Sequence, residues 1–294
     1  MTVLRIERVL APNPGVFALE GTNTWIVGED PSIVIDPGPD DVEHLDEVAR
    51  TAGDVAAVVV THDHEDHAPG ATRLAALVGA PLHAFRLEGA QHLRDGQTIV
   101  AGRVSLVAVH TPGHSSDHVV FHLPRERALF TGDAVLGRGT SFIDPPDGDL
   151  TAYTRSLKRM RDLDPCTLYP GHGPVSLHAE EKLGEYIDHR AEREGQIVDA
   201  MAGGARTIPE LVTIIYAAHP PEVHPLAARS VLAHLVKLET EGRVARSGKG
   251  DGATWEPVLP RECARCGRRV TGRARYCSTC SLVILQEGAG AQPP

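Results

Sequence analysis

The feature that most constrains this 294-residue chain is the run HDHEDH at residues 62–67, which directly follows the apolar residues 55–60. The apolar residues predict a buried strand, and the Ala-Pro-Gly after the run predicts the start of a helix. Because side chains two positions apart in an extended segment point the same way, His62 and His64 can bind one metal ion. Two side chains at the turn into the helix can reach a second ion: Asp66 and His67. The alternative interpretation is a solvated acidic loop with chance histidines.

Three further candidate ligands follow apolar, strand-like segments later in the chain. Each lies beside glycine or proline, which supply the sharp turns needed to aim a side chain inward. Sites in layered α/β proteins are commonly built where strand ends meet at one edge of a sheet. We therefore expect three residues to join the first run: His114, Asp133 and His172.

The segments HDHEDH, TPGHS, TGD and PGHG occur in this order over roughly the first 190 residues, and the set resembles the metallo-β-lactamase superfamily. The resemblance implies an α/β fold, a four-layer αββα sandwich. It also implies that His62, His64 and His114 hold one ion of a dinuclear centre. The remaining ligands would hold the second ion, with one carboxylate bridging both ions: Asp66, His67, His172 and the bridging Asp133.

A narrower resemblance points to the subfamily of the mitochondrial lactamase-like endoribonuclease. It rests on five segments, at residues 13–15, 19–25, 35–38, 137–140 and 186–190. Fungal polyketide thioesterases share much of the same pattern. Because these members catalyse different reactions, the resemblance describes the architecture better than the substrate.

The expected ligands determine the expected chemistry. Two divalent cations about 3.5–4 Å apart can share one water and lower its pKa to near neutrality, so that the hydroxide attacks carbon or phosphorus. Imidazole-rich ligation favours zinc, with iron or manganese as alternatives. Asp66 is expected to orient the nucleophile as well as to bind metal, and Asp36 to orient a ligand from outside. His118 either faces the pocket or caps a polar surface.

Residues 196–259 predict a winged helix. Thr207 and Glu210 have the spacing of a capping box, and apolar residues recur at helical spacing over residues 226–239. Two short strand-like segments around a Gly-rich turn follow. A winged helix can bind nucleic acid, but acidic residues and few basic ones on the candidate recognition helix favour a substrate-shaping or dimerising role.

Four of the five cysteines form two C-x-x-C pairs, which predict a structural zinc ribbon over residues 260–285. A segment this short cannot bury enough apolar surface to fold unaided, so the metal would stabilise it. Two disulfides or a redox pair are the alternatives. The expected zinc ligands are Cys263, Cys266, Cys277 and Cys280. The fifth cysteine, Cys166, is expected to be a small core residue.

The expected organisation is a catalytic domain (1–195), a winged helix (196–259), a zinc ribbon (260–285) and a disordered tail (286–294). The formal net charge is −10, yet residues 261–275 carry six arginines against one glutamate. Such a basic segment suits either contact with nucleic acid or a solvated rim. No segment reaches the ~18 apolar residues of a membrane-spanning helix, and none resembles a signal peptide. We therefore expect a cytoplasmic protein without a membrane partner.

Together these features predict a hydrolase with two zinc ions in the active site and one in the ribbon, using a metal-bridging hydroxide. Single-stranded RNA is the favoured substrate, which would make the protein a phosphodiesterase. A thioester hydrolase, of the glyoxalase-II or acyl-thioester type, or a lactone hydrolase is the alternative. A nucleic-acid-binding module with an inert lactamase-like domain is a third hypothesis, and the complete ligand set argues against it. The expected partners are the substrate and, optionally, a second copy of the chain.

Overall fold

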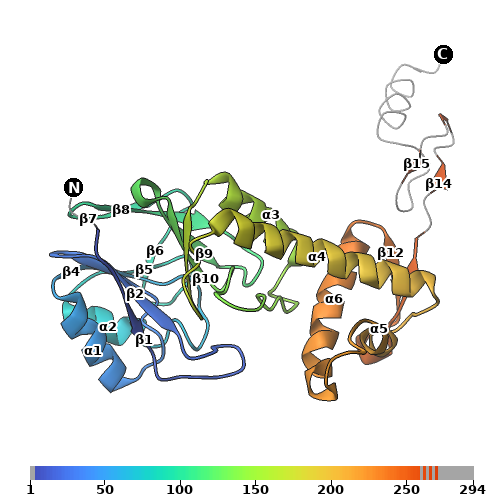
Figure 1. The fold of residues 1–294 in the computed structure, drawn as a ribbon, viewed down its shortest axis with the longest axis horizontal. Helices are drawn as coiled ribbons and strands as arrows, with labels where there is room; N and C mark the ends of the chain where they lie inside the picture. Colours follow the sequence, from blue (N-terminus) through green and yellow to red (C-terminus); the bar gives the residue numbers. More distant parts are fainter. Residues whose placement is uncertain (1–3, 259–260, 263–264, 267–268, 271–294) are drawn as a thin grey trace, which may run out of the picture. The chain divides into compact units, whose positions relative to one another are not determined.

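The computed structural model describes residues 4–258, 261–262, 265–266 and 269–270. The chain divides into two compact units, Met1–Arg190 and Ala191–Pro294. Figure 1 shows two sheets in the first unit with helices on their outer faces. The long helix α4 (Ala179–Ala202) begins in the first unit and ends in the second.

The first sheet has six strands in chain order. The first three pair antiparallel and the remainder parallel: β1 (Ile6–Leu10), β2 (Asn23–Gly28), β3 (Ser32–Ile35), β4 (Val55–Val59), β5 (Leu82–Ala84) and β6 (Gln91–His92). Helix α1 (Val42–Ala52) connects β3 to β4, and α2 (Ala71–Val78) connects β4 to β5. Parallel strands need such crossovers, which place helices over one face of the sheet.

Alternation along the strands assigns each face of the first sheet. Ile26, Val34 and Val58 pack into one apolar cluster with Leu45 and Leu74 of the two helices. Their neighbours along the strands point the other way, into the cluster between the two sheets. The strands are therefore apolar on both faces, which explains the near-continuous apolar run before residue 61.

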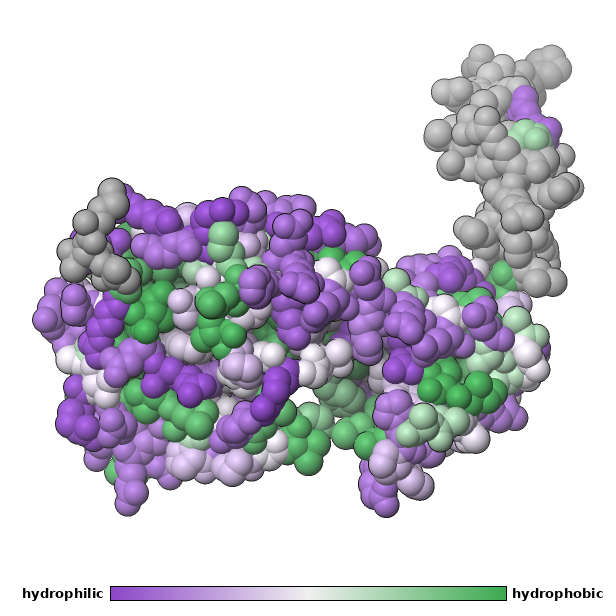
Figure 2. Space-filling view, viewed as in Figure 1, coloured by the Kyte–Doolittle hydropathy of each residue, from purple (hydrophilic) through white to green (hydrophobic). Residues whose placement is uncertain are grey.

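The second sheet has five strands in the order β11-β10-β9-β8-β7. Their bounds are β7 (Thr98–Ala101), β8 (Val104–His110), β9 (Val119–Leu123), β10 (Ala128–Gly132) and β11 (Thr167–Pro170), with a 3₁₀ turn at Pro124–Glu126. Leu106, Phe121 and Phe130 meet Trp25 of the first sheet in the central core. Helix α3 (Leu150–Asp162) and the start of α4 cover the outer face (Figure 1), which completes the αββα layers. The exposed surfaces of both helices are largely hydrophilic (Figure 2).

The second unit has the order of elements predicted for a winged helix. Helix α5 (Ile208–Ile215) starts with the predicted capping box between Thr207 and Glu210. A 3₁₀ turn (Pro221–Val223), α6 (His224–Thr240), and the antiparallel pair β12 (Val244–Ser247) and β13 (Thr254–Pro257) follow, with a 3₁₀ turn (Gly250–Gly252) between the strands. Trp255 is fully buried among apolar residues of α5 and α6.

Only part of the predicted zinc ribbon lies within the described residues. The two-residue strands β14 (Arg261–Glu262) and β15 (Arg269–Val270) pair antiparallel, and Cys266 lies in the turn between them. The other three proposed ligands lie outside the described residues: Cys263, Cys277 and Cys280. The predicted tail lies outside them as well.

Cys166 corrects one expectation. Its side chain is exposed: it lies in the connection just before β11, where burial alternates along the chain from Pro165 (buried) to Cys166 (exposed). Across the part of the chain that the structure describes, no helix combines the length and apolar character needed to cross a bilayer.

Candidate metal centre

Four connections that follow strands bring the expected ligands together. The turn after β4 supplies four of them, and the turns after β8, β10 and β11 supply one each. The ligand atoms form two groups, each lying within 4.8 Å. The first group is His62, His64 and His114, and the second is Asp66, His67, Asp133 and His172. All seven non-cysteine ligands that the sequence predicts therefore lie in one place.

In the first group, three imidazole nitrogens face a common point. His62 Nε2 lies 2.9 Å from His64 Nδ1, which lies 3.1 Å from His114 Nε2. His62 and His64, which the sequence places on one side of the chain, present different ring nitrogens to this point: Nε2 of His62 and Nδ1 of His64. The arrangement suits three corners of a metal coordination sphere.

The second group mixes imidazoles with carboxylates. His172 Nε2 lies 3.1 Å from His67 Nε2 and 3.1 Å from Asp66 Oδ2. Asp133 Oδ1 lies 3.3 Å from His172 Nε2 and 3.4 Å from His67 Nε2, whereas Asp133 Oδ2 lies 3.7 Å from His114 Nε2 of the first group. Asp133 therefore faces both groups, one oxygen toward each. Its Oδ1 is buried and has no hydrogen-bond partner among the described residues, as expected of an oxygen that binds a cation.

In two of the rings, the hydrogen-bond partner of the nitrogen that faces away from the centre determines which nitrogen carries the proton. His114 Nδ1 lies 2.8 Å from the Phe142 carbonyl oxygen, and His172 Nδ1 lies 3.1 Å from that of Gly21. A carbonyl only accepts, so each Nδ1 must donate. Each Nε2 then presents a lone pair to the centre. Such hydrogen bonds from the far nitrogen are the usual support of a metal-bound imidazole.

Asp36 supports two more rings from below the centre. Thr61 donates its N–H to Asp36 Oδ1 (2.7 Å) and its hydroxyl to Asp36 Oδ2 (2.8 Å), so Thr61 Oγ1 accepts from His62 Nδ1 at 2.9 Å. His67 Nδ1 donates to Asp36 Oδ2 at 2.9 Å. A buried carboxylate thus orients one ligand of each group, the outside role that the sequence suggests for this residue.

Two glycines allow the turns to approach one another this closely. Gly132 has a φ of +46°, and a Cβ there would lie 2.6 Å from Thr61 Oγ1 and 2.9 Å from His118 Nε2. A Cβ on Gly171 would lie 2.6 Å from the ring of His67 and 2.9 Å from Asp133 Oδ1. A larger residue at Gly132 or Gly171 would therefore clash with the neighbouring turns. At Gly132, the positive φ also favours glycine.

The segment GTNTW, used above only as part of a resemblance, holds the last ligand turn. Asn23 Nδ2 donates to the carbonyls of Pro170 and Gly173, both at 2.9 Å, and so fixes the turn that carries His172. The Thr22 hydroxyl donates to the Asp66 carbonyl at 2.8 Å. The first sheet therefore ties the ligand turn of β4 to that of β11.

The two groups differ in charge. Burial lowers the pKa of His62 well below its ordinary value and lowers that of His114. In the second group burial acts in the same direction, but the adjacent carboxylates of Asp133 and Asp66 raise the pKa of His172 to about 9. Burial of His67 would lower its pKa, but Asp133 and Asp36 raise it well above its ordinary value. The carboxylates thus make the second group a region that attracts positive charge.

These donors fit a pair of divalent cations. The lone pairs of nitrogen and oxygen atoms that converge at about 3 Å repel one another. A cation that binds between them removes this repulsion, because each lone pair then coordinates the cation. Imidazole and carboxylate ligands suit zinc, iron or manganese. The Asp66 side chain is 28% exposed, so the second group is open to solvent on one side. An open position is the mark of a catalytic rather than a structural site.

His118 lies neither in the pocket nor at the surface, contrary to both options that the sequence offers. The ring is fully buried beside the centre. Its Nε2 accepts the backbone N–H of Asp133 at 3.2 Å, and its Nδ1 lies 3.1 Å from Thr111 Oγ1. The pairing of β9 with β10 places the ring there, because residue 118 directly precedes β9 and β10 ends at Gly132. No local sequence motif signals that pairing.

Comparison with known protein families shows one match over more than half of the chain. Residues 18–172 match the family described as the metallo-beta-lactamase superfamily. The chain belongs to the metallo-β-lactamase superfamily. It is a hydrolase of that superfamily, and the family described as the beta-lactamase associated winged helix domain matches residues 207–255, which confirms the predicted winged helix.

Relatives of this superfamily member cover most of its length. It is 36% identical over 271 residues to an atrochrysone carboxyl ACP thioesterase from Aspergillus chevalieri, covering 85% of this chain and 86% of that one. It is 33% identical over 256 residues to a beta-lactamase-like protein 2 homologue from Caenorhabditis elegans, with 81% and 85% covered. A beta-lactamase domain protein from Burkholderia ambifaria has the same fold, with a TM-score of 0.73 at 18% identity over 86% of this chain and 91% of that one.

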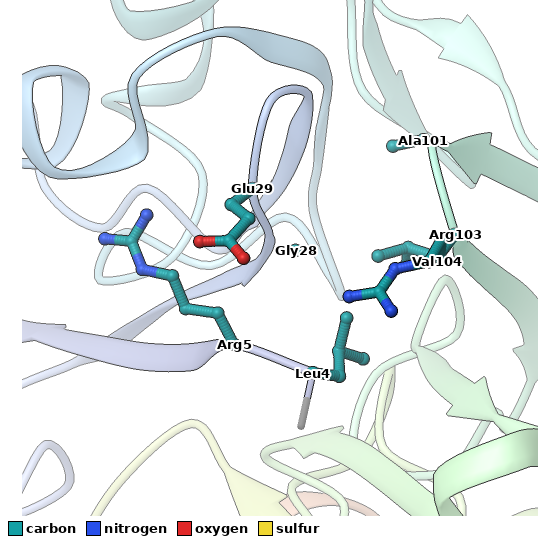
Figure 3. Close-up of a pocket in the computed structure, with 7 residues that line it drawn as sticks. All are labelled: Leu4, Arg5, Gly28, Glu29, Ala101, Arg103 and Val104. Carbon is teal, nitrogen blue, oxygen red and sulfur yellow. The ribbon is translucent and has the colours of Figure 1, made fainter. Parts of the chain in front are cut away.

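A small pocket is drawn in Figure 3. It is lined by Leu4, Arg5, Gly28, Glu29, Ala101, Arg103 and Val104. Asn23 begins β2 at the metal-centre end and Gly28 ends it at the pocket. None of the residues that line this pocket belongs to either ligand group.

Proposed function

We propose that this protein is a zinc-dependent thioester hydrolase that acts on acyl groups with an apolar portion. The observation on which the proposal chiefly rests is an exposed apolar loop beside the two ligand groups. The charge around the centre and the name of one relative support it further.

The loop between β1 and β2 contacts the second ligand group directly and is connected to the first through Phe142. At its end, the Gly21 carbonyl accepts from His172 of the second group. At its tip, the Phe17 ring lies 5.5 Å from that of Phe142, whose carbonyl accepts from His114 of the first group. A ligand that reaches the centre beside this loop would therefore meet aromatic side chains.

The tip of the loop is unusually exposed for apolar residues. Phe17 is 53% exposed and Val16 is 80% exposed. Figure 2 shows hydrophobic surface at the position of this loop. Exposed apolar side chains gathered beside a polar site indicate contact with an apolar ligand or partner. An acyl chain or aromatic acyl group on the substrate would cover them.

Charge near the centre disfavours a polyanion. Asp147, on the loop before α3, accepts the N–H of Ser116 at 3.0 Å. Burial would raise its pKa, but the Ser116 hydrogen bonds and the nearby charges of His64 and Arg86 lower it, so the group is anionic beside the first ligand group. Arg138, another cation of this region, is paired with Glu20. With a net charge of −10, the protein would repel a phosphate backbone more than a neutral thioester.

The relative from Aspergillus chevalieri is named as an ACP thioesterase, and it shares more than a third of aligned residues with this chain. A thioester presents an electrophilic carbonyl carbon and needs a nucleophile, a proton acceptor and positive charge for the developing oxyanion. When bound, two zinc ions supply an activated water and that positive charge.

The protein's own residues supply the rest. Asp66 is the solvent-facing carboxylate of the second group, and its Oδ2 is held 3.1 Å from His172 Nε2. Burial would raise its pKa, but His172 and His67 lower it, so the carboxylate is ionised and can orient the attacking water and accept its proton. The loop of Phe17 would hold the acyl portion and exclude bulk water.

A side-by-side assay tests the proposal. The zinc-loaded protein is given a series of acyl-pantetheine thioesters of increasing apolar size and, separately, a labelled RNA oligomer. We expect hydrolysis of the thioesters, with kcat/KM rising with acyl size. Cleavage of the RNA without hydrolysis of any thioester would overturn the proposal.

The variant F17A sharpens the assay. Loss of the ring should raise KM for the larger acyl groups about tenfold, with little change in kcat, because the contact is made before and during reaction alike. Leu77 is the matched control, since it is also 53% exposed but lies on α2. Equal effects of F17A and L77A would show that Phe17 does not contact the substrate.

Single-stranded RNA remains the second candidate. The six arginines of residues 261–275 and the winged helix favour it. The same assay separates the two, because salt should weaken RNA cleavage steeply and thioester hydrolysis little.

A further inference from the structure

His118 is a buried imidazole beside the centre that belongs to neither ligand group. It directly precedes β9, where the strand runs beside the end of β10. The ring is 0% exposed, and its two nitrogens both have partners from neighbouring strand ends. One partner is Thr111, from the turn that carries His114, and the other is the backbone of Asp133.

The direction of these hydrogen bonds follows from the chemistry of the partners. A backbone N–H only donates, so the N–H of Asp133 requires an unprotonated Nε2 on His118, at 3.2 Å. The proton of the neutral ring is then on Nδ1, which donates to Thr111 Oγ1 at 3.1 Å. The Thr111 N–H also donates to the His118 carbonyl at 2.9 Å, so the two residues are fixed to each other.

The orientation of the Asp133 side chain depends on its backbone. Asp133 Oδ1 has no hydrogen-bond partner among the described residues, so side-chain hydrogen bonds do not hold that oxygen. The backbone is held on one side by His118 and on the other by Ala134, whose carbonyl accepts from the Tyr153 hydroxyl at 2.6 Å. The peptide that joins Gly132 to Asp133 is itself held at both polar atoms: His118 Nε2 accepts its N–H at 3.2 Å, and its carbonyl accepts the N–H of Gly171 at 2.9 Å.

We propose that His118 is a positioning residue for Asp133 and thereby controls how tightly the centre holds its second zinc ion. The proposal rests on the dinuclear centre of the proposed function, and it is independent of the substrate. Asp133 directs one oxygen to each ligand group, so a small rotation of its backbone would spoil contact with one of them. One zinc ion could then still bind to a complete ligand group, but two zinc ions could not both do so.

Two substitutions separate the two hydrogen bonds of the ring. The amide oxygen of H118Q can reach the position of Nε2 and accept the Asp133 N–H. The shorter amide of H118N can reach only the position of Nδ1, toward Thr111. Both variants are polar and of similar size, so each serves as the control of the other. Thermal unfolding of both proteins verifies that they are folded.

Zinc titration by calorimetry, with zinc content measured after dialysis, provides the readout. H118N should bind the second zinc ion of the centre about 10- to 100-fold more weakly than the unaltered protein, the usual effect of losing a residue that supports a ligand. H118Q should bind it within about threefold of the unaltered protein. Any zinc held by the cysteine pairs is common to all three proteins and cancels.

Three results would overturn the proposal. H118N could bind both ions as tightly as the unaltered protein, or H118N and H118Q could be weakened equally. The unaltered centre could bind fewer than two ions, which would remove the dinuclear centre itself. By contrast, two tightly bound ions with no hydrolysis of thioesters would contradict only the proposed substrate. Should H118N fail to fold, nitrogen chemical shifts of His118 in the zinc-loaded protein provide the test, and a ring protonated at Nε2 would overturn the proposal.

Discussion

The two ligand groups of the centre differ in kind. The first consists of three imidazoles, and burial keeps two of them neutral by lowering the pKa of His62 and of His114. The second contains two carboxylates, and its imidazoles have raised pKa values. The second group therefore attracts a cation by the charge of its carboxylates. The first group coordinates a cation through neutral nitrogen atoms.

The magnitude of the electrostatic term decides which half dominates. Two unit charges about 4 Å apart interact by about 4 kcal/mol at an effective dielectric constant of about 20, which corresponds to about three orders of magnitude in affinity. Neutral imidazoles supply no such attraction. We therefore expect the second group to bind the first ion, and the first group to depend on the Asp133 oxygen that faces it.

Removal of the shared carboxylate should have the largest effect on zinc binding, because it weakens both groups at once. The variant D133N keeps the shape of the side chain but removes its charge. Hydrolysis should fall by more than about 100-fold, the upper range for a residue that only supports a ligand. Zinc content and kcat/KM measure the effect.

D147N is the matched control for D133N, since Asp147 is an anion beside the first group but in neither ligand group. Its activity should change much less. Equal losses in the two variants would show that general negative charge, and not bridging, explains the contribution of Asp133.

Loss of one imidazole from the first group comes next. H64A should abolish turnover while the fold survives, because His64 lies in a turn and not in either apolar core. The second group should keep its ion, so zinc content should fall by one. H172A should instead weaken the first ion to bind. Activity equal to that of the unaltered protein in H64A would contradict the assignment.

Protons released on binding should distinguish the groups more finely. A raised pKa means that the group is protonated below it, so His172, with a pKa of about 9, carries a proton near neutral pH in the metal-free protein. Zinc must displace that proton, and binding should tighten as the pH rises toward 9. In the first group, the lowered pKa values of His62 and His114 leave those two rings without a proton to release.

Calorimetric titration in buffers of different ionisation enthalpy measures this release. The first equivalent of zinc should release protons at neutral pH, and the second should release fewer. A first equivalent that binds without proton release would reverse the order that we assign to the two groups.

The sequence predicts the seven ligands of the centre because their signal is local. An apolar strand followed by histidines at fixed spacing determines both direction and proximity, as at His62 and His64. The winged helix is predicted for the same reason, since its capping box at Thr207 and its helical periodicity lie within short segments.

The supporting residues are harder to predict because their roles depend on contacts across the sheets. His118 is 15 positions from the residue whose N–H it accepts, and Asn23 is 147 positions from Pro170. Nothing in the spacing of these residues reveals the pairing of β9 with β10 or the register of β2. Cys166 shows the same limit on a smaller scale, since an apolar run alone does not tell which of its alternating side chains face the core, and this one is exposed.

The smallest effect on hydrolysis is expected from the cysteine pairs. Cys277 and Cys280 lie outside the described residues, and a predicted ribbon is a closed structural site that has no role in the reaction. Replacing both by serine should release about one zinc ion and leave the two ions of the centre in place, with kcat/KM for a thioester unchanged. Unchanged zinc content would contradict the ribbon. A loss of two or more ions would instead show that the centre depends on the cysteine segment, and the comparison between the two ligand groups would then have to include it.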